Sequence, residues 1–319
     1  MTTISIIIPV KRGGYVSAFD AIRQSGFDND LYEVLLAEGC APSRQRNMAA
    51  KAATGDLLYF IDDDSLLDSA NLSICSYIMK DKQIAVVGGP SLTPDTDSWL
   101  QQLFGMALSS VFGAGGVRNR YRAVGVARQT TDKELILCNL VFRRSVFISV
   151  GGFNERLYPN EENELLDRVK SKGYGLMHVP EMCVFRSQRT TLKAFVRQMF
   201  SYGRGRASQS LITSSFSLIS FIPLIFIVYL TCVLLFFHNV LLMLPLFMYT
   251  VLVMLFSLVE ALKSGRISAI LLIFVYPLMH IVNGYGLLFG LLAGKPVPVC
   301  SQEISVSKIK RFGEELPDF

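Results

Sequence analysis

Charge is missing from two long stretches of this 319-residue sequence. No Asp, Glu, Lys or Arg occurs from Ala207 to Val259, and none occurs from Ile267 to Gly294. A membrane-spanning helix needs about 20 mostly apolar residues, so the first stretch is long enough for two helices and the second for one. The buried helical core of a soluble protein is the alternative, but helices in such a core normally keep one polar face. We therefore expect a membrane domain at 207–294, with helices at about 211–237, 240–261 and 268–292.

Other absences narrow the class of protein. The apolar segment Ile4–Val10 is too short for a signal peptide and has no basic stretch before it, so we expect residues 1–206 to stay in the cytoplasm. The three histidines and six cysteines have no metal-site spacing, which predicts reduced, mostly structural thiols. The tail, 295–319, is polar and mixed in charge, and we expect it to be flexible.

Basic residues gather just before the first charge-free stretch, with no acid among them. Such residues mark the cytoplasmic side of a membrane helix and attract anionic head groups. Lys263 and Arg266 precede the last apolar stretch, where two crossings would return the chain to the cytoplasm. The sequence thus predicts a multi-pass protein of the cytoplasmic membrane. We expect it to contact the lipid bilayer and to bind no nucleic acid. The basic residues are Arg186, Arg189, Lys193, Arg197, Arg204 and Arg206.

Residues 1–206 alternate between short apolar runs and helix-like segments, which is typical of an α/β domain with a mainly parallel, Rossmann-like sheet. Ligands of such sheets lie beyond the carboxyl ends of the strands, so Pro9, Glu38 and Asp62–Asp64 are expected to line one site. The stretch 93–122 fits either an amphipathic segment on the membrane surface or a core helix with a loop. The expected strands are Ser5–Val10, Tyr32–Ala37, Asp56–Ile61 and Ile84–Val87, and the expected helices are Ser43–Ala53 and Asn71–Lys80.

Three acids, Asp62, Asp63 and Asp64, follow the third expected strand directly. Adjacent carboxylates repel one another, and a bound cation or hydrogen-bond donors would relieve that repulsion. Carboxylate oxygens suit Mg²⁺ or Mn²⁺, which commonly bridge one or two carboxylates to substrate phosphates. A solvated acidic turn capping the next helix is the alternative. At a strand end of an α/β domain, the triplet predicts a metal and phosphate site.

Two further segments carry chemistry-bearing residues. In Asn160–Leu165, Glu161 or Glu162 could remove a proton from an acceptor hydroxyl, although acids also simply favour a helix N-terminus. In Gln198–Arg206, Arg204 and Arg206 stand among glycines and could hold a diphosphate. Anchoring beside the membrane is the alternative for these arginines, and both roles are compatible.

In five segments, in this order, the chain resembles family 2 glycosyltransferases with the GT-A fold. The subgroup that it resembles comprises the membrane-associated transferases that build bacterial exopolysaccharide of the succinoglycan type. The resemblance covers residues 3 to about 210 and continues more loosely into the membrane part. The segments are Ile4–Val10, Glu38–Ser65, Cys138–Glu155, Asn160–Leu176 and Ser201–Ala207.

The resemblance implies an inverting hexosyltransferase that moves a sugar from a nucleoside-diphosphate sugar, a UDP-sugar in our expectation, to a lipid-linked glycan. It implies that Asp62 contacts the nucleotide and Asp64 binds the Mg²⁺ or Mn²⁺. Glu162 stands where the family usually has an aspartate base, with Glu161 as the second candidate. The remaining nucleotide-sugar contacts would come from Pro9, Glu38, Arg46, Asn47 and Asp63.

The sequence also departs from the family pattern. The Gln-x-x-Arg-Trp motif of processive synthases is absent, and the first loop, Lys11–Tyr15, lacks the usual Asn-Glu pair. Two alternatives stay open: a polyprenyl-phosphate sugar synthase of the dolichol-phosphate type, and a membrane scaffold that keeps an inactive transferase fold.

Overall fold

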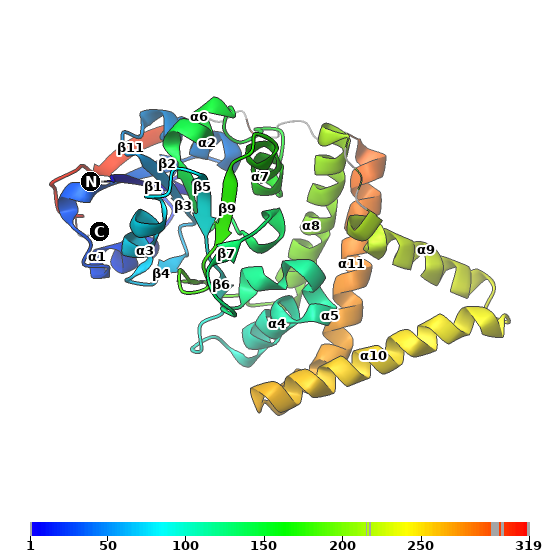
Figure 1. Cartoon of the computed structure of the whole chain (residues 1–319). Helices are drawn as coiled ribbons and strands as arrows, with labels where there is room; N and C mark the ends of the chain where they lie inside the picture. The colour runs from blue at the N-terminus through cyan, green and yellow to red at the C-terminus, as the bar shows by residue number, and fades with distance from the viewer. Residues whose placement is uncertain (1, 215, 217, 295–299, 301–302, 318–319) are drawn as a thin grey trace. The chain divides into compact units, whose positions relative to one another are not determined.

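The computed structural model describes residues 2–214, 216, 218–294, 300 and 303–317 (Figure 1). The chain forms two compact units, each built from separate segments. The first unit comprises Met1–Pro94, Asn119–Ser187 and Val297–Phe319, and the second comprises Asp95–Arg118 and Gln188–Pro296. The second segment of the first unit thus ends at Ser187, whereas the sequence analysis extends the first domain to residue 206.

An eight-stranded mixed sheet, ordered β11-β2-β1-β3-β8-β5-β9-β7, is the centre of the first unit. Every residue of β1 and β3 is buried, as expected for strands covered on both faces. The four expected strands form, and the mixed α/β fold is confirmed. One group of strands runs in a single direction: β1 (Ile4–Val10), β2 (Tyr32–Glu38), β3 (Leu57–Ile61), β5 (Ile84–Gly88) and β9 (Gly175–His178). The others run opposite: β7 (Arg128–Gln129), β8 (Asn139–Arg143) and β11 (Ser305–Lys310).

Helices cover both faces of this sheet because alternate strand residues point to opposite sides. On one face Ile6, Ile8 and Tyr59 share a core with α1 (Ala18–Gln24) and α3 (Asn71–Ile78). On the other face Ile7, Leu58 and Phe60 pack with three helices. The ring of Phe60 lies 5.1–5.8 Å from the rings of Phe142, Phe147 and Phe153. Those three helices are α2 (Pro42–Ala52), α6 (Arg144–Ser149) and α7 (Glu161–Ser171).

A small second sheet lies beside the carboxyl end of β3. Its middle strand β10 (Val184–Phe185) pairs with β4 (Leu66–Leu67) on one side and with β6 (Ser91–Leu92) on the other. Because β4 follows the acidic triplet and Arg186 follows β10, this pairing brings residues from opposite ends of the domain together.

The described part of the tail, residues 303–317, is ordered, contrary to the expectation of flexibility. β11 pairs antiparallel with β2 and completes the edge of the main sheet. The fully buried ammonium group of Lys310 donates hydrogen bonds to the carbonyls of Asn29, Tyr32 and Arg311 at 2.7–3.2 Å, and it lies 3.7 Å from the centre of the Tyr32 ring. These contacts fix the tail to the first unit.

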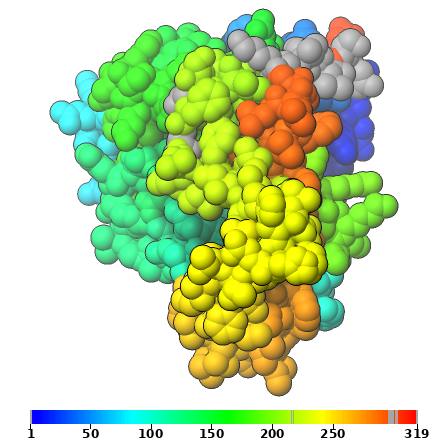
Figure 2. Space-filling model, turned by 90° about the vertical axis from the view of Figure 1, so that its right-hand side faces the viewer, coloured from blue at the N-terminus to red at the C-terminus, as the bar shows by residue number. Residues whose placement is uncertain are grey.

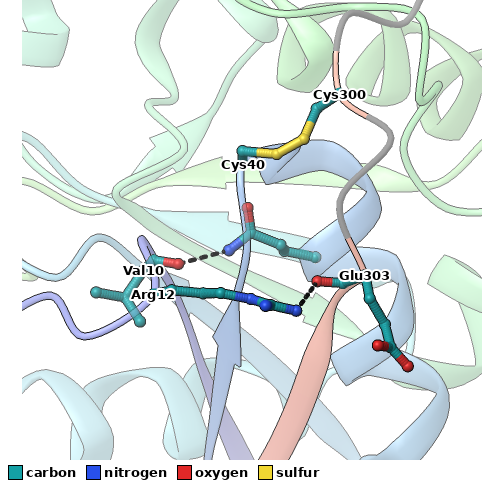
Figure 3. Close-up of a disulfide and its surroundings, with 6 residues drawn as sticks. Val10, Arg12, Cys40, Cys300 and Glu303 are labelled. Carbon is teal, nitrogen blue, oxygen red and sulfur yellow. Dashed lines mark hydrogen bonds between the residues drawn. A yellow bond between two sulfur atoms is a disulfide. The ribbon is translucent and has the colours of Figure 1, made fainter.

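Cys40 and Cys300 form a disulfide between the end of β2 and the tail, with their Cα atoms 6.1 Å apart (Figure 3). This corrects the expectation that all the cysteines are reduced, which rested on spacing, and a pair 260 residues apart has no spacing signature. Beside the disulfide, Arg12 donates a hydrogen bond to the carbonyl of Glu303 (Figure 3). Burial raises the pKa of Cys75 to about 12 and that of Cys138 to about 11, which disfavours the reactive thiolate form.

The second unit is helical. Its α4 (Trp99–Ser109) is a core helix, because Phe104 stacks on Phe195 of α8 (Leu192–Thr213) with ring centres 4.0 Å apart. This resolves the stretch 93–122 in favour of a core helix. The other helices are α5 (Val111–Ala114), α9 (Ile222–Leu235), α10 (Val240–Ser264) and α11 (Leu272–Ala293).

Three helical segments are long and apolar enough to cross a membrane: Leu218–Leu235, Val240–Ser264 and Ile267–Ala293. Atoms of α10 (yellow) lie on the face shown in Figure 2, and Leu241, Leu244 and Phe247 are mostly exposed. The first segment begins later than the predicted limit at 211, because α8 continues to Thr213.

α8 and α11 lie side by side (Figure 1). They approach so closely that a Cβ atom on Gly203 would lie 2.1 Å from the carbonyl oxygen of Asn283, and one on Gly286 would lie 2.1 Å from that of Phe200. Gly203, which precedes Arg204, thus has a helix-packing role.

Candidate active site

The acidic triplet lies at the carboxyl end of β3, as predicted. A turn closed by the Ser65 N–H on the Asp62 carbonyl (3.1 Å) follows the strand. The Asp63 carbonyl accepts hydrogen bonds from Ala18 N–H and the Ser17 hydroxyl, both at 3.2 Å. The pKa of the Asp63 carboxyl is raised, first by burial and then by the charges of Asp64 and Asp62. The backbone is therefore held in place while the three carboxyl groups stay crowded.

Two arginines relieve this crowding. Arg46 of α2 donates to one carboxylate oxygen of Asp62 at 2.8 Å. Arg186 lies 3.2 Å from the other oxygen of Asp62 and donates to Asp64 at 2.6 Å. The side chain of Arg46 is 5% exposed and that of Arg186 is 27% exposed. Opposite charges this close favour the ionised carboxylates.

The two candidate bases begin α7. Glu161 accepts a hydrogen bond from Arg46 at 3.1 Å, so Arg46 joins Glu161 to Asp62. Glu162 instead pairs with Arg120, 3.2 Å away. Arg120 belongs to the 3₁₀ helix η2 (Gly115–Tyr121) and is anchored by the carbonyls of Asp132 and Lys133. Both acids are buried, and at a helix N-terminus their negative charge is favoured by the helix dipole.

Burial raises the pKa of Glu161, to about 8. The neighbouring charges of Glu162 and Asp62 act in the same direction, whereas Arg46 opposes them. Arg46 is shared between two carboxylates, so it compensates only part of the cost of burying Glu161 in the ionised form. Burial therefore favours the protonated form of Glu161.

The family description "Glycosyl transferase family group 2" matches residues 57–287, which include the triplet, both candidate bases and most of the apolar region. The chain belongs to this glycosyltransferase family. The expectation of a GT-A glycosyltransferase is confirmed at this level.

A relative from Rhizobium meliloti (strain 1021), "Succinoglycan biosynthesis protein ExoA", is 32% identical over 114 residues. This alignment covers 36% of the chain and only 33% of the relative. Among solved structures, "Mannosyltransferase PcManGT from Pyrobaculum calidifontis in complex with GDP-Man and Mn2+" is similar with a TM-score of 0.54 and 14% identity. That similarity covers 92% of this chain and 88% of the other, and it supports the shared fold.

Other residues predicted for the glycosyltransferase site have structural contacts of their own. The carboxylate of Glu38 accepts hydrogen bonds from Gly13 N–H (3.0 Å) and the Ser305 hydroxyl (3.3 Å), so it joins the first loop to the tail. The amide of Asn47 bonds to Phe153 N–H, the Phe153 carbonyl and Glu155. Their predicted roles toward the nucleotide stay predictions.

Pro9 pairs with Ala37 inside the sheet. Arg204 and Arg206 lie on α8 of the second unit, where Arg206 donates to Gln209 at 3.1 Å. A role for these three residues toward the donor or acceptor also stays a prediction.

Sequence reasoning missed Arg120 and misplaced Arg186. Arg186 was grouped with the basic residues beside the membrane, yet it binds Asp62 and Asp64. The signal in the sequence is that Arg186 directly follows a short strand, β10. Neighbouring residues do not reveal that β10 pairs with β4 and β6, which is what brings Arg186 to the aspartates.

Two cavities of about 280 and 540 Å³ lie away from this site. The smaller is lined by residues that include Thr54, Asp56 and Arg144, at the opposite ends of β1 and β3. At the acidic cluster, guanidinium groups pack directly against the carboxylates.

Proposed function

We propose that this protein moves a sugar from a nucleoside-diphosphate sugar, a UDP-sugar in the first instance, to a glycan linked to polyprenyl diphosphate during exopolysaccharide assembly. The observation that carries the proposal is the strand-end cluster of Asp62 and Asp64 with Arg46 and Arg186, in a chain of this family. Among the described residues, the buried Nε of Arg46 lacks a hydrogen-bond partner, so one donor of the cluster is unsatisfied. The succinoglycan relative supports the polymer class.

The donor set fits a divalent cation that is shared with the substrate. No group of three or more His, Cys, Asp or Glu residues that could hold a metal is present in the described part of the chain. Mg²⁺ or Mn²⁺ commonly takes one or two carboxylates and completes its shell with phosphates and water, so Asp64 and Asp62 would be the protein ligands. Such an ion would supply electrostatic stabilisation of the leaving diphosphate.

Glu162 would accept the proton of the acceptor hydroxyl as that oxygen attacks the anomeric carbon with inversion. Glu161 is the second candidate, but burial favours its protonated form and so makes it less available as a base. Arg120 would position Glu162, because it holds this carboxylate at 3.2 Å and is itself anchored by two backbone carbonyls. Arg46 would hold the carboxyl groups of Glu161 and Asp62 in fixed positions relative to each other.

The acceptor would reach the enzyme in the bilayer. Lys193, Arg197 and Arg204 are exposed on α8, where they and Arg206 could attract the phosphates of a lipid-linked acceptor or the lipid head groups. Residues 207–294 would be the part that meets the bilayer, and the first unit would lie in the cytoplasm.

The tail limits how this chain can cross the membrane. Because β11 is hydrogen-bonded to β2, residues 305–310 must lie on the same side of the bilayer as the rest of the first unit. The chain would therefore cross an even number of times, although three helices are long enough to cross. We propose that α9 and α10 cross and that α11 does not, because α11 packs along α8, whose exposed face is charged.

Transfer of radiolabelled sugar by the full chain in lipid tests the proposal. We expect Asp64→Ala and Glu162→Gln each to lower turnover by about 10²-fold or more, while the exposed control Glu181→Gln leaves it unchanged. Undiminished turnover in both variants would refute the site. A product with one sugar on a polyprenyl monophosphate would favour the synthase alternative, and absence of nucleotide binding with Mn²⁺ would favour an inactive scaffold.

A further inference from the structure

Arg186 is held by its backbone while its side chain keeps some freedom. Its N–H donates to the carbonyl of Leu92 at 2.9 Å, beside the small sheet. Its guanidinium donates to Asp64 at 2.6 Å and lies 3.2 Å from Asp62. The side chain is 27% exposed, against 5% for Arg46. Of the two arginines, Arg186 is therefore the one with room to move.

The arginines occupy the oxygens that a shared cation would need. Both carboxylate oxygens of Asp62 and one of Asp64 are engaged by Arg46 or Arg186. The positive charges of Arg46 and Arg186 lie against the carboxylates of Asp62 and Asp64, so these two carboxylates are paired without an added ion. An ion bridging Asp62 and Asp64 would require Arg186 to leave, because two cations cannot share these oxygens without strong repulsion.

We propose that Arg186 is a diphosphate-binding residue that exchanges partners during the catalytic cycle. In one arrangement, the one described above, Arg186 holds Asp62 and Asp64 through oxygens that a shared cation would need. With a donor present, its guanidinium turns to the diphosphate oxygens, which it can contact in bidentate fashion. This inference rests on the proposed function, since it assumes a nucleoside-diphosphate donor at this cluster.

Partner exchange makes binding of cation and nucleotide cooperative. When the nucleotide is absent, displacing Arg186 leaves a guanidinium without a counter-charge, so binding of the cation is weakened. When the diphosphate is present, Arg186 gains a new anionic partner. Since such coupling is reciprocal, each ligand should tighten binding of the other.

The test compares Arg186→Gln and Arg186→Lys with Arg189→Gln in the full chain in detergent. Arg189 is exposed and three residues away, so it serves as the matched control. Binding of Mn²⁺ alone is followed by electron paramagnetic resonance, and binding of UDP and of GDP is followed by calorimetry with saturating Mn²⁺.

We expect Arg186→Gln to bind Mn²⁺ alone about tenfold more tightly and the nucleotide about tenfold more weakly, on the scale of one charge-assisted pair. Arg186→Lys keeps the charge but loses the bidentate geometry. It should bind Mn²⁺ alone as weakly as the wild type and also lose nucleotide affinity. Arg189→Gln should match the wild type in both assays.

Partner exchange predicts that Arg186→Gln changes the two affinities in opposite directions, with tighter binding of Mn²⁺ and weaker binding of the nucleotide. A purely structural role of Arg186 predicts that both affinities fall. If Arg186→Gln weakened Mn²⁺ binding as well, Arg186 would merely hold the aspartates in place. If both Arg186 variants bound nucleotide like the wild type, Arg186 would not contact the diphosphate. Either result overturns the inference while the wild type still binds nucleotide with Mn²⁺; a wild type that binds neither nucleotide would refute the proposed function itself.

Discussion

Replacing Arg46 by Gln should destabilise the first unit strongly. Arg46 is buried and forms ion pairs with two carboxylates, Asp62 at 2.8 Å and Glu161 at 3.1 Å. Removing one partner of a buried ion pair typically costs about 3–5 kcal/mol, because it leaves an uncompensated charge. For a unit of this size, each kcal/mol lowers the melting temperature by about 2–4 °C. We therefore expect a decrease of roughly 6–20 °C.

Thermal unfolding of the full chain in detergent, followed by circular dichroism at pH 9, above the pKa of about 8 of Glu161, measures this change. Arg44→Gln is the matched control, because Arg44 lies on the same helix two residues away and is exposed. A surface substitution of this kind changes stability by about 0.5 kcal/mol or less. Adding Glu161→Gln to Arg46→Gln should recover part of the lost stability, since Glu161 is then neutral while Asp62 keeps its pair with Arg186.

The reasoning fails if Arg46→Gln melts within about 2 °C of Arg44→Gln, the shift that roughly 0.5–1 kcal/mol produces. It also fails if Glu161→Gln gives no recovery in the double variant. Either result would mean that Arg46 is not the cation that makes burial of Asp62 and Glu161 tolerable.

Three further predictions concern the site, the tail and the membrane helices. Glu161 binds its proton more tightly in the folded state, with a pKa of about 8 against an ordinary 4.5, so the folded protein holds more protons between these values. The free energy of unfolding should therefore fall as pH rises from about 4.5 to 8, by at most about 1.4 kcal/mol per pH unit. When this free energy is measured by urea unfolding at several pH values in this range, Glu161→Gln should flatten its dependence on pH. Lys310→Met should make the tail sensitive to protease, because three carbonyls lose a charged donor. Reducing the Cys40–Cys300 disulfide in the wild type should instead leave β11 protected. Equal digestion of the variant and of the reduced wild type would contradict this prediction. The membrane prediction uses single cysteines placed in the tail at Glu314, in the link at Ser264 and in the first unit at Lys82. In inside-out vesicles, a membrane-impermeant label should reach all three from the same side. Labelling of the cysteine at position 314 from the opposite side would refute an even number of crossings.

The elements predicted correctly from the sequence are those whose residues carry the signal locally. The strands β1 and β3 are continuous apolar runs because both of their faces are covered, and the acidic triplet marks where β3 ends. The apolar helices are recognisable because they carry almost no charge, with Glu260 and Lys263 confined to the last turns of α10. Each of these signals depends on neighbouring residues alone.

The remaining features depend on partners far away in the chain. β11 has few apolar residues, and its Val306 and Ile309 pack against different faces of the sheet, so no clean alternation marks it as a strand. Its burial of Lys310 depends on carbonyls about 280 residues away. Arg186 was grouped with its basic neighbours because its contact with Asp62 and Asp64 arises only when β10 pairs with β4 and β6.

Crystals of the full chain grown with UDP and Mn²⁺ would test the central claim most directly, through an anomalous difference map at the manganese edge. The account predicts a peak about 2.0–2.6 Å from a carboxylate oxygen of Asp64, with the guanidinium of Arg186 on the diphosphate and no longer on the aspartates. Nucleotide bound with no peak at Asp64, and with Arg186 still paired to Asp62 and Asp64, would contradict it.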